Sequence, residues 1–414
     1  MAPSIDSSDR RAFLGFLAAS PLLSAAGFTP RWLEAILAAP VAAQDEVIIK
    51  SVREALNIFD FEAAARAKLS VPHFIEFTAG VFNDETLRAN REAFTKYQIK
   101  IRRLLGIGKV DQSVQIFGVR WDSPIFLCPV GRITALNPEG NLAVARAANA
   151  KRTLEIMSGV QQLDQVNTLR GQPVWICLQG GVPAQDLIKR LEAAGTPVLV
   201  WTIDDNGNGN QIGARAVQRA GVANLERKDD PRCSSCHQNE GRITLSDSLN
   251  DVLGALGSLR GQAANLVTWN DVKRVRGMTR MKLVLKGIVA REDAELAVQN
   301  GADGIVVSNH GAHEDASGRG SLECLPEIVA GVGGKIPIFI DSGFRSGADV
   351  FKALALGATA VGVGRAYAWG LASFGQEGVE TVIELLRREL QVVMAQTGAT
   401  SIPRISRASL IPRA

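Results

Sequence analysis

The sequence predicts an α/β fold, a (β/α)8 TIM barrel that has an N-terminal helical segment and a long loop after its fourth strand. The first observation is that short runs of apolar and β-branched residues recur eight times between residues 125 and 366. The second is that each run leads into a glycine-rich or polar corner and then into a helical pattern. Continuous apolar strands that alternate with helices indicate a parallel sheet buried on both faces, and eight such units close a barrel.

Length and composition agree with one large domain and argue against nucleic acid as a partner. The chain has 414 residues, of which 46% are hydrophobic, so it can bury a large core within the size range of a single barrel. Forty glycines fit many tight joints between strands and helices. The net charge is +4 and the sequence has no basic block with interleaved aromatic residues, so we expect no binding to nucleic acid.

The first 43 residues have the features of an export signal. Arg10 and Arg11 are followed by a short apolar run, which is the twin-arginine pattern. Cleavage after Ala26 and cleavage after Ala43 both fit the sequence, and the alternative to a signal is an amphipathic N-terminal helix of a cytosolic protein. The twin-arginine route carries folded proteins, so we expect a periplasmic protein whose cofactor is inserted before export.

Residues 46–414 are expected to form the barrel domain. Its first part, residues 46–100, has apolar residues at helical spacing, and Asn83 and Asp84 are candidates for a helix cap. The interval between the fourth and fifth strands, residues 205–280, is a long excursion, and loops of that length often carry function. The eight expected strands and the last expected helix are residues 125–130, 153–158, 174–179, 198–204, 282–288, 304–310, 336–343, 360–366 and 377–398.

Charged and polar residues stand at the ends of five consecutive predicted strands. They are Asp204, Lys286, His310, Asp341 and Arg365, in chain order. In a (β/α)8 barrel the carboxyl ends of the strands surround the active site, so these side chains should converge on one mouth. An acid, a lysine, an imidazole and an arginine that meet in one place indicate a catalytic site.

The last two strand ends predict an anion site. Gly343 and Gly364 would let backbone N–H groups approach a phosphate, and Arg345 and Arg365 would add charge-assisted donors. Asp341 would suit a sugar-like hydroxyl. Riboflavin monophosphate (FMN) presents both a phosphate and a polyol chain, but a phosphorylated sugar would satisfy the same groups.

Two long segments carry a resemblance to a known family. "LKGIVAREDAELAVQNGADGIVVSNHGA" and "IFIDSGFRSGADVFKALALGATAVGVGRA" closely resemble the FMN-dependent α-hydroxy acid oxidases and dehydrogenases, such as glycolate oxidase, lactate oxidase and the flavin domain of flavocytochrome b2. The resemblance covers essentially residues 50–410 and is most specific over 282–370. It implies an FMN-dependent oxidoreductase of 2-hydroxy acids or alcohols that assembles as a homo-oligomer.

The resemblance also assigns three catalytic roles. His310 corresponds to the base that removes a proton from the substrate while a hydride equivalent passes to the flavin. Asp204 corresponds to the acid that pairs with this histidine, and a nearby carboxylate stabilises the imidazolium that forms. Lys286 corresponds to a lysine beside the flavin ring, where a cation stabilises the negative charge of the reduced form.

Further residues are assigned to the cofactor. They come from the loop after the first strand and from the ends of the other strands, and the full set is Pro129, Val130, Gly131, Ser158, Thr202, Lys286, Ser308, Asp341, Ser342, Gly343, Arg345, Gly364 and Arg365.

Three positions in the expected substrate pocket depart from the family pattern. His313 stands where the family has an arginine that grips the substrate carboxylate, and histidine is a weaker cation without the bidentate fork. Glu76 and Gln179 stand where the family uses two tyrosines. We therefore expect the substrate to carry a hydroxyl without being a simple small α-hydroxy acid. The alternatives are an acid held by Arg319 or Arg132, or a flavoprotein that transfers electrons without oxidising a substrate of its own.

A second motif lies in the long excursion. Cys233, Cys236 and His237 form C-x-x-C-H, the attachment signature of haem c. A haem would give electrons an exit from the flavin, but the excursion is too short for a cytochrome domain, and a disulfide or half of a metal site would fit the residues as well. We predict no metal site, and the electron acceptor is left open among oxygen, a quinone and cytochrome c.

Overall fold

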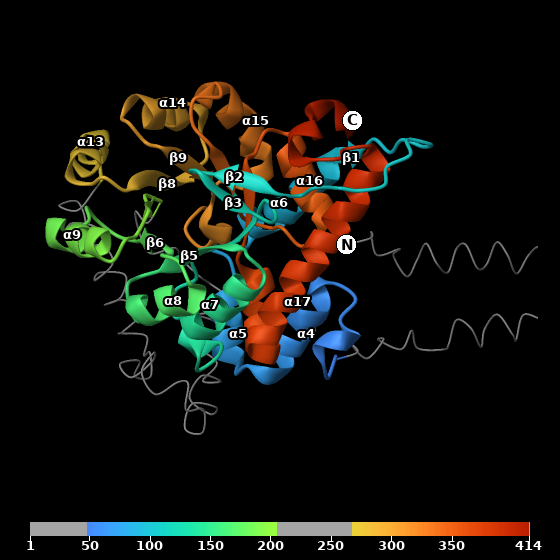
Figure 1. Cartoon of the computed structure of the whole chain (residues 1–414), viewed down its shortest axis with the longest axis horizontal. Helices are drawn as coiled ribbons and strands as arrows, with labels where there is room; N and C mark the ends of the chain where they lie inside the picture. Colours follow the sequence, from blue (N-terminus) through green and yellow to red (C-terminus); the bar gives the residue numbers. More distant parts are fainter. Residues whose placement is uncertain (1–47, 205–266, 414) are drawn as a thin grey trace, which may run out of the picture. The chain divides into compact units, whose positions relative to one another are not determined.

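The eight predicted strands are the eight strands of a closed parallel barrel in the computed structural model, which describes residues 48–204 and 267–413 (Figure 1). The predicted fold is therefore confirmed. The expected signal over residues 1–43, residues 205–266 of the excursion, and the candidate haem residues within it lie outside the described residues. The barrel strands are β4 (Ile125–Leu127), β5 (Leu154–Ser158), β6 (Trp175–Leu178), β7 (Val198–Thr202), β8 (Lys282–Ile288), β9 (Gly304–Val307), β10 (Ile338–Ile340) and β11 (Ala360–Val363).

The strands pair in chain order, and the last pairs with the first. Val363 of β11 lies beside Leu127 of β4, which closes the ring. Successive side chains of a strand point to opposite faces, so one set fills the barrel and the other packs under the helices. The ring of Phe339 meets those of Phe126 and Trp175 edge-on inside the barrel, with centroids 6.0 and 5.7 Å away. A Cβ at Gly362 would lie 2.6 Å from the Phe126 ring, so this glycine makes room for the aromatic side chain.

A hairpin packs at the end of the barrel where the strands begin. It consists of β2 (Val114–Ile116) and β3 (Val119–Trp121), which are antiparallel. Ile116 and Trp121 are buried in the cluster that fills the barrel, and the Phe117 ring lies 5.5 Å from that of Trp175, the first residue of β6. The strand ends that carry the predicted site residues are at the opposite end of the barrel.

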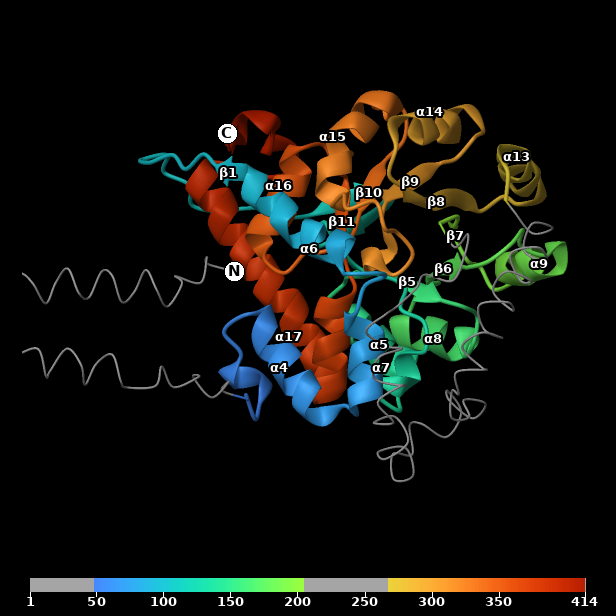
Figure 2. The ribbon, with the colours of Figure 1, turned by 180° about the vertical axis from the view of Figure 1, so that it is seen from behind.

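Helices that follow the strands form an outer ring around the barrel (Figures 1 and 2). The last predicted helix is confirmed but begins twelve residues earlier than expected, since α17 runs from Arg365 and changes direction at Phe374 and Gly375. No helix of the described residues is long and apolar enough to cross a bilayer. The ring contains α7 (Gly140–Ala150), α8 (Leu163–Arg170), α9 (Gln185–Ala193), α13 (Trp269–Met278), α14 (Arg291–Gln299), α15 (Ser321–Val332), α16 (Gly347–Ala355) and α17 (Arg365–Thr397).

The segment before the barrel is helical, as predicted, up to Lys96. The expected helical pattern over Tyr97 and Gln98 is wrong, because these residues form β1 (Tyr97–Ile99), which pairs with β12 (Leu410–Pro412) near the far end of the chain. A pairing partner more than 300 residues away overrides the local preference. The remaining short elements are η1 (Val52–Glu54), α4 (Ile58–Lys68), α5 (Val71–Thr78), α6 (Glu85–Glu92), η2 (Ala93–Lys96), η3 (Ile133–Ala135), η5 (His310–Ala312), η6 (Ile402–Arg404) and η7 (Arg407–Ser409).

A buried ion pair ties β5 to the helix that follows it. Arg170 donates to Glu155 at 2.8 Å, and the side chains are 1% and 2% exposed. Burial raises the pKa of Glu155, although Arg170 opposes that rise. Removing one partner from such a pair leaves the other charge buried without compensation.

Glu155→Gln is therefore expected to lower the free energy of unfolding by about 3–5 kcal/mol. The measurement is the midpoint of urea unfolding followed by circular dichroism. Glu384→Gln is the matched control, because Glu384 pairs with Lys151 at the surface, where such a pair contributes less than about 1 kcal/mol. Equal midpoints for the two variants would show that the buried pair of Glu155 and Arg170 stabilises the fold no more than a surface pair does.

Candidate active site

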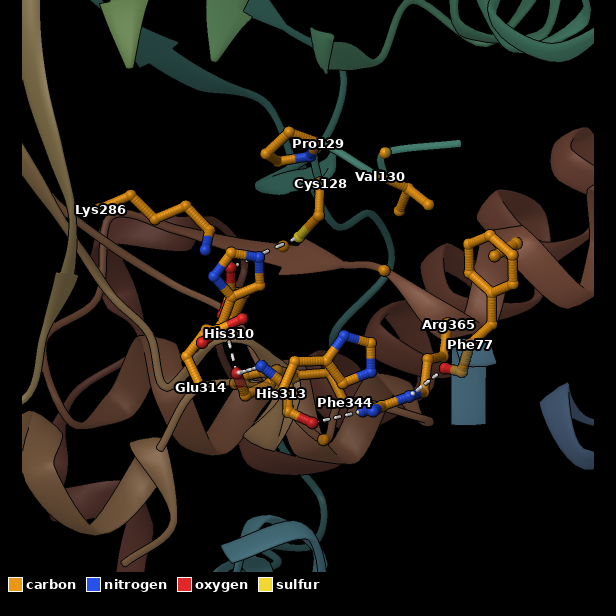
Figure 3. Close-up of a pocket in the computed structure, with 18 of the residues that line it drawn as sticks. Phe77, Cys128, Pro129, Val130, Lys286, His310, His313, Glu314, Phe344 and Arg365 are labelled. Atoms are coloured by element: carbon orange, nitrogen blue, oxygen red, sulfur yellow. Dashed lines mark hydrogen bonds between the residues drawn. The ribbon is translucent and has the colours of Figure 1, made fainter. Parts of the chain in front are cut away.

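A cavity of about 340 Å³ opens at the carboxyl ends of the barrel strands. Lys286, His310, His313 and Arg365 lie in succession along one side of it, and Pro129 faces them (Figure 3). The cavity is lined by Glu76, Phe77, Cys128, Pro129, Val130, Gly131, Arg132, Gln179, Lys286, His310, Gly311, His313, Glu314, Asp341, Ser342, Gly343, Phe344, Arg345, Gly362, Gly364, Arg365 and Ala368.

The predicted base and acid lie together at the wall of this cavity. His310 Nδ1 is 3.2 Å from Asp204 Oδ1. Burial opposes ionisation of Asp204, but Lys286 and His310 outweigh it and hold the pKa of Asp204 below its ordinary value. An ionised carboxylate only accepts hydrogen bonds, so Nδ1 of His310 carries a hydrogen and donates it to Asp204, which leaves Nε2 as the ring nitrogen that can accept a proton. Gln179 Nε2 lies 3.2 Å from that atom and donates to it.

Lys286 places a buried cation beside this pair. The side chain is 3% exposed, and its Nζ has no hydrogen-bond partner among the described residues. Burial alone would lower the pKa of Lys286, but the carboxylates of Asp204 and Asp341 outweigh it and hold the pKa above the ordinary value. A charged ammonium with three unused N–H groups therefore lies at the cavity wall, where it can donate to an electron-rich ring system.

A left-handed turn holds His310 in position. His310, Gly311 and Ala312 all have positive φ, at 54°, 65° and 69°, a conformation that costs free energy for residues with a side chain. Asn309, just before the turn, exchanges two amide hydrogen bonds with Asn90 of α6, at 2.9 and 2.7 Å. The buried amide pair anchors the strained loop to the segment that precedes the barrel.

The cavity is cationic at the end formed by β10 and β11. Arg345 stacks over Trp369 at 4.5 Å, and burial followed by repulsion from Arg365 lowers the pKa of Arg345 to about 9. Arg365 donates to the carbonyls of Phe77, Gly311 and Ala79, and burial lowers its pKa to about 10. An anion between the two arginines would relieve this repulsion.

The turn at the end of β10 adds backbone donors to this cationic end. Ser342 and Gly343 are both left-handed, at φ 78° and 87°. Such turns expose consecutive N–H groups that bind phosphate. Lys286 at one end of the cavity and this arginine cluster at the other fit the ring and the phosphate of FMN.

Most of the predicted cofactor residues line the cavity, and three do not. Ser158 ends β5, and its Oγ lies 3.9 Å from where a Cβ of Gly131 would be. Thr202 is buried against Cys177, with Oγ1 3.2 Å from the sulfur, and Ser308 is fully buried and accepts from the His310 N–H at 3.1 Å. In this structure Ser308 thus supports the His310 turn.

The three altered positions all line the cavity. Glu76, on α5, forms an ion pair with Arg132, and Gln179 contacts the base. Burial, followed by the charges of Arg365, His310 and Lys286, holds the pKa of His313 well below its ordinary value, so this ring is neutral at neutral pH. The His313 and His310 rings stack 6.4 Å apart at an angle of 13°.

Several contributors are not evident from the strand pattern. Asn90 comes from a helix outside the barrel, and its polar side chain is ordinary for a helix surface; only its contact with Asn309 shows its use. Phe77 and Ala79 accept hydrogen bonds from Arg365 through their backbone carbonyls, and such contacts cannot be predicted from the identity of the side chains. Among the described residues, no group of three or more histidine, cysteine or acidic side chains is placed to hold a metal ion.

Known proteins are similar to this chain in both sequence and fold. The family of FMN-dependent dehydrogenases matches residues 65–412. Glycolate oxidase 1 from Oryza sativa subsp. japonica is 33% identical over 364 residues, which cover 86% of this chain and 96% of that protein. A peroxisomal (S)-2-hydroxyacid oxidase from Arabidopsis thaliana is 32% identical over 358 residues, which cover 85% and 95% of the two chains.

A crystal structure of mandelate oxidase superposes with a TM-score of 0.72 at 33% identity, covering 87% of this chain and 98% of that one. The similarity in sequence and in fold is consistent with the cavity, where Lys286 is a buried cation at one end and Arg345 and Arg365 form an arginine cluster at the other. The chain belongs to the family of FMN-dependent α-hydroxy acid oxidases and dehydrogenases, and it is an FMN-dependent oxidoreductase.

Proposed function

We propose that the enzyme oxidises a hydroxyl-bearing substrate that is not a small α-hydroxy carboxylate. The observation that carries the proposal is that His310, backed by Asp204, opens into the same cavity as the unpartnered ammonium of Lys286. The positions that hold the substrate acid in the family are here a neutral His313, an amide and an ion-paired glutamate. The oxidising groups are therefore kept, while the anion-binding groups are changed.

The residues of the chain handle the proton and the charge. The substrate hydroxyl displaces the Gln179 amide from His310 Nε2, which then accepts the hydroxyl proton, and Asp204 stabilises the imidazolium that results. Bound FMN would supply the acceptor for the hydride equivalent that leaves the substrate carbon bearing the hydroxyl. Lys286 supplies a fixed positive charge at the cavity wall, which favours negative charge placed beside it.

The cofactor would be held by the residues around the cavity. Arg345 and the N–H groups after β10 would bind the phosphate, and the carboxylate of Asp341, which lines the cavity and raises the pKa of Lys286, would accept from a hydroxyl of the polyol chain. The loop of Pro129 and Val130 would lie along the ring through its backbone. A small-molecule substrate would then enter from the side of Glu76 and Gln179.

Two arginines, Arg319 and Arg132, are the alternative ligands for a substrate acid. Arg319 does not line the cavity and pairs with Glu327 at 2.7 Å. Arg132 lines the cavity, but Glu76 offsets its charge. Neither arrangement favours a carboxylate, which supports the proposal of a different substrate.

Anaerobic mixing tests this function. A neutral hydroxy compound should bleach the visible flavin absorbance faster than lactate or glycolate does, because, among the described residues on the substrate side of the pocket, Arg132 is paired with Glu76 and His313 is neutral. His310→Ala should slow the bleaching by about 10²- to 10⁴-fold, the usual contribution of a positioned base, while FMN stays bound.

The control for this experiment is His313→Gln, which exchanges the neighbouring neutral ring for a neutral amide and should keep the larger part of the rate. Rapid reduction by lactate or glycolate would refute the substrate assignment. Unchanged turnover in His310→Ala would remove His310 from the role of base. A flavoprotein that only relays electrons would show no bleaching with any hydroxy compound.

We further propose that the protein works in the periplasm after twin-arginine export and that Cys233, Cys236 and His237 carry haem c. The supporting features are the Arg10-Arg11 pair before an apolar run and the C-x-x-C-H spacing. If the protein is exported, the periplasmic fraction of the source cells should contain it. If haem c is attached covalently, the Soret absorbance of the protein should survive denaturation. Arg10→Lys with Arg11→Lys should retain it in the cytoplasm. Its absence from the periplasm would refute export, and a spectrum with flavin bands alone would refute the haem.

A further inference from the structure

Glu76 and Arg132 form an ion pair that lines the substrate side of the cavity. Glu76 lies on α5, and Arg132 follows β4 in a left-handed conformation, at φ 49°. Arg132 NH1 donates to Glu76 Oε1. The glutamate is 21% exposed and the arginine 65% exposed, so the pair reaches from the cavity wall to solvent.

The pair leaves one oxygen unused. Glu76 Oε2 is buried and has no hydrogen-bond partner among the described residues. A buried carboxylate oxygen without a donor is costly, so a bound molecule that donates a hydrogen bond to Oε2 would be favoured. Among the described residues Arg132 donates through NH1 to Glu76, so its other guanidinium nitrogens can donate to a bound molecule.

From this arrangement we infer that Glu76 and Arg132 together select an uncharged group that both donates and accepts hydrogen bonds, such as a carboxamide or a second hydroxyl next to the oxidised carbon. A carboxylate cannot donate to Oε2 and is repelled by it. A cationic group would gain from Glu76 but would be repelled by Arg132. The inference rests on the proposed function and specifies its substrate class.

Glu76 is accordingly the residue that excludes acids. It offsets the charge of Arg132, the arginine that lines this side of the cavity, and adds its own negative oxygen. His313 cannot restore the charge because its ring is neutral. Removing the negative charge at position 76, without changing the shape of the side chain, should free Arg132 to bind a carboxylate in a charge-assisted pair.

The test compares matched acids and amides in anaerobic flavin reduction. The pairs are glycolate and glycolamide, lactate and lactamide, and mandelate and mandelamide, which differ only in the charged group. The wild-type enzyme should reduce its flavin at least tenfold faster with the amide of a pair. Glu76→Gln should raise the rate with the acid by at least tenfold, and adding Arg132→Met should abolish that gain.

Glu327→Gln is the matched control. It makes the same substitution in the ion pair of Arg319, which lies outside the cavity lining, and it should leave the preference for amides unchanged. A Glu76→Gln enzyme with the wild-type ratio of acid to amide rates would overturn the inference. So would a wild-type enzyme that prefers the acids.

A binding readout separates this inference from the proposed function. If no hydroxy compound reduces the flavin in any variant, the proposed oxidation fails. Propionate and propionamide, which cannot be oxidised in this way, still report on the pocket through the perturbation of the flavin spectrum. Glu76→Gln should then bind propionate at least tenfold more tightly than the wild type does, and equal affinity would refute the role of Glu76.

Discussion

The buried ammonium of Lys286 is the charge around which the rest of the site is arranged. It lies on β8, the carboxylates of Asp204 and Asp341 at the ends of two other strands raise its pKa, and its Nζ has no hydrogen-bond partner among the described residues. A cation in that position is tolerable only because two acids face it. Asp204 in turn stays ionised because Lys286 and His310 lower its pKa, and ionised Asp204 is what orients the ring of His310.

This chain of dependence explains why the catalytic half of the site is complete while the substrate half is altered. The acid, the base and the lysine occupy the ends of barrel strands, where the backbone is rigid and one residue sets the environment of the next. The substrate side is built from α5 and from residues beyond β4, β6 and β9, outside the strands themselves. Glu76, Gln179 and His313 thus alter which group is bound without disturbing the pair of Asp204 and His310.

The sequence was sufficient for the barrel and for the strand-end residues, because both depend on local patterns. Eight apolar runs in alternation with helices fit few other folds, and the carboxyl ends of barrel strands surround the mouth of the barrel. The structure brings Asp204, Lys286 and His310 together, as expected from their places in the chain.

What could not be predicted depends on contacts between distant segments. The amide pair of Asn90 and Asn309 joins residues 219 positions apart, and β1 pairs with a strand near the far end of the chain. The pairing of Arg132 with Glu76 offsets a charge that the sequence alone presents as free. The neutrality of His313 follows from its burial beside three positive or ionisable neighbours.

The reduction potential of the bound flavin tests the central role of Lys286 most directly. Lys286→Met should lower the two-electron potential by at least about 30 mV, which is a tenfold change in the reduction equilibrium, because the charge that stabilises the reduced flavin is lost. Lys282→Met is the control, since this exposed lysine begins the same strand and pairs with Asp303 at 2.8 Å. It should leave the potential unchanged. A Lys286→Met protein that binds FMN and keeps the wild-type potential would contradict the account.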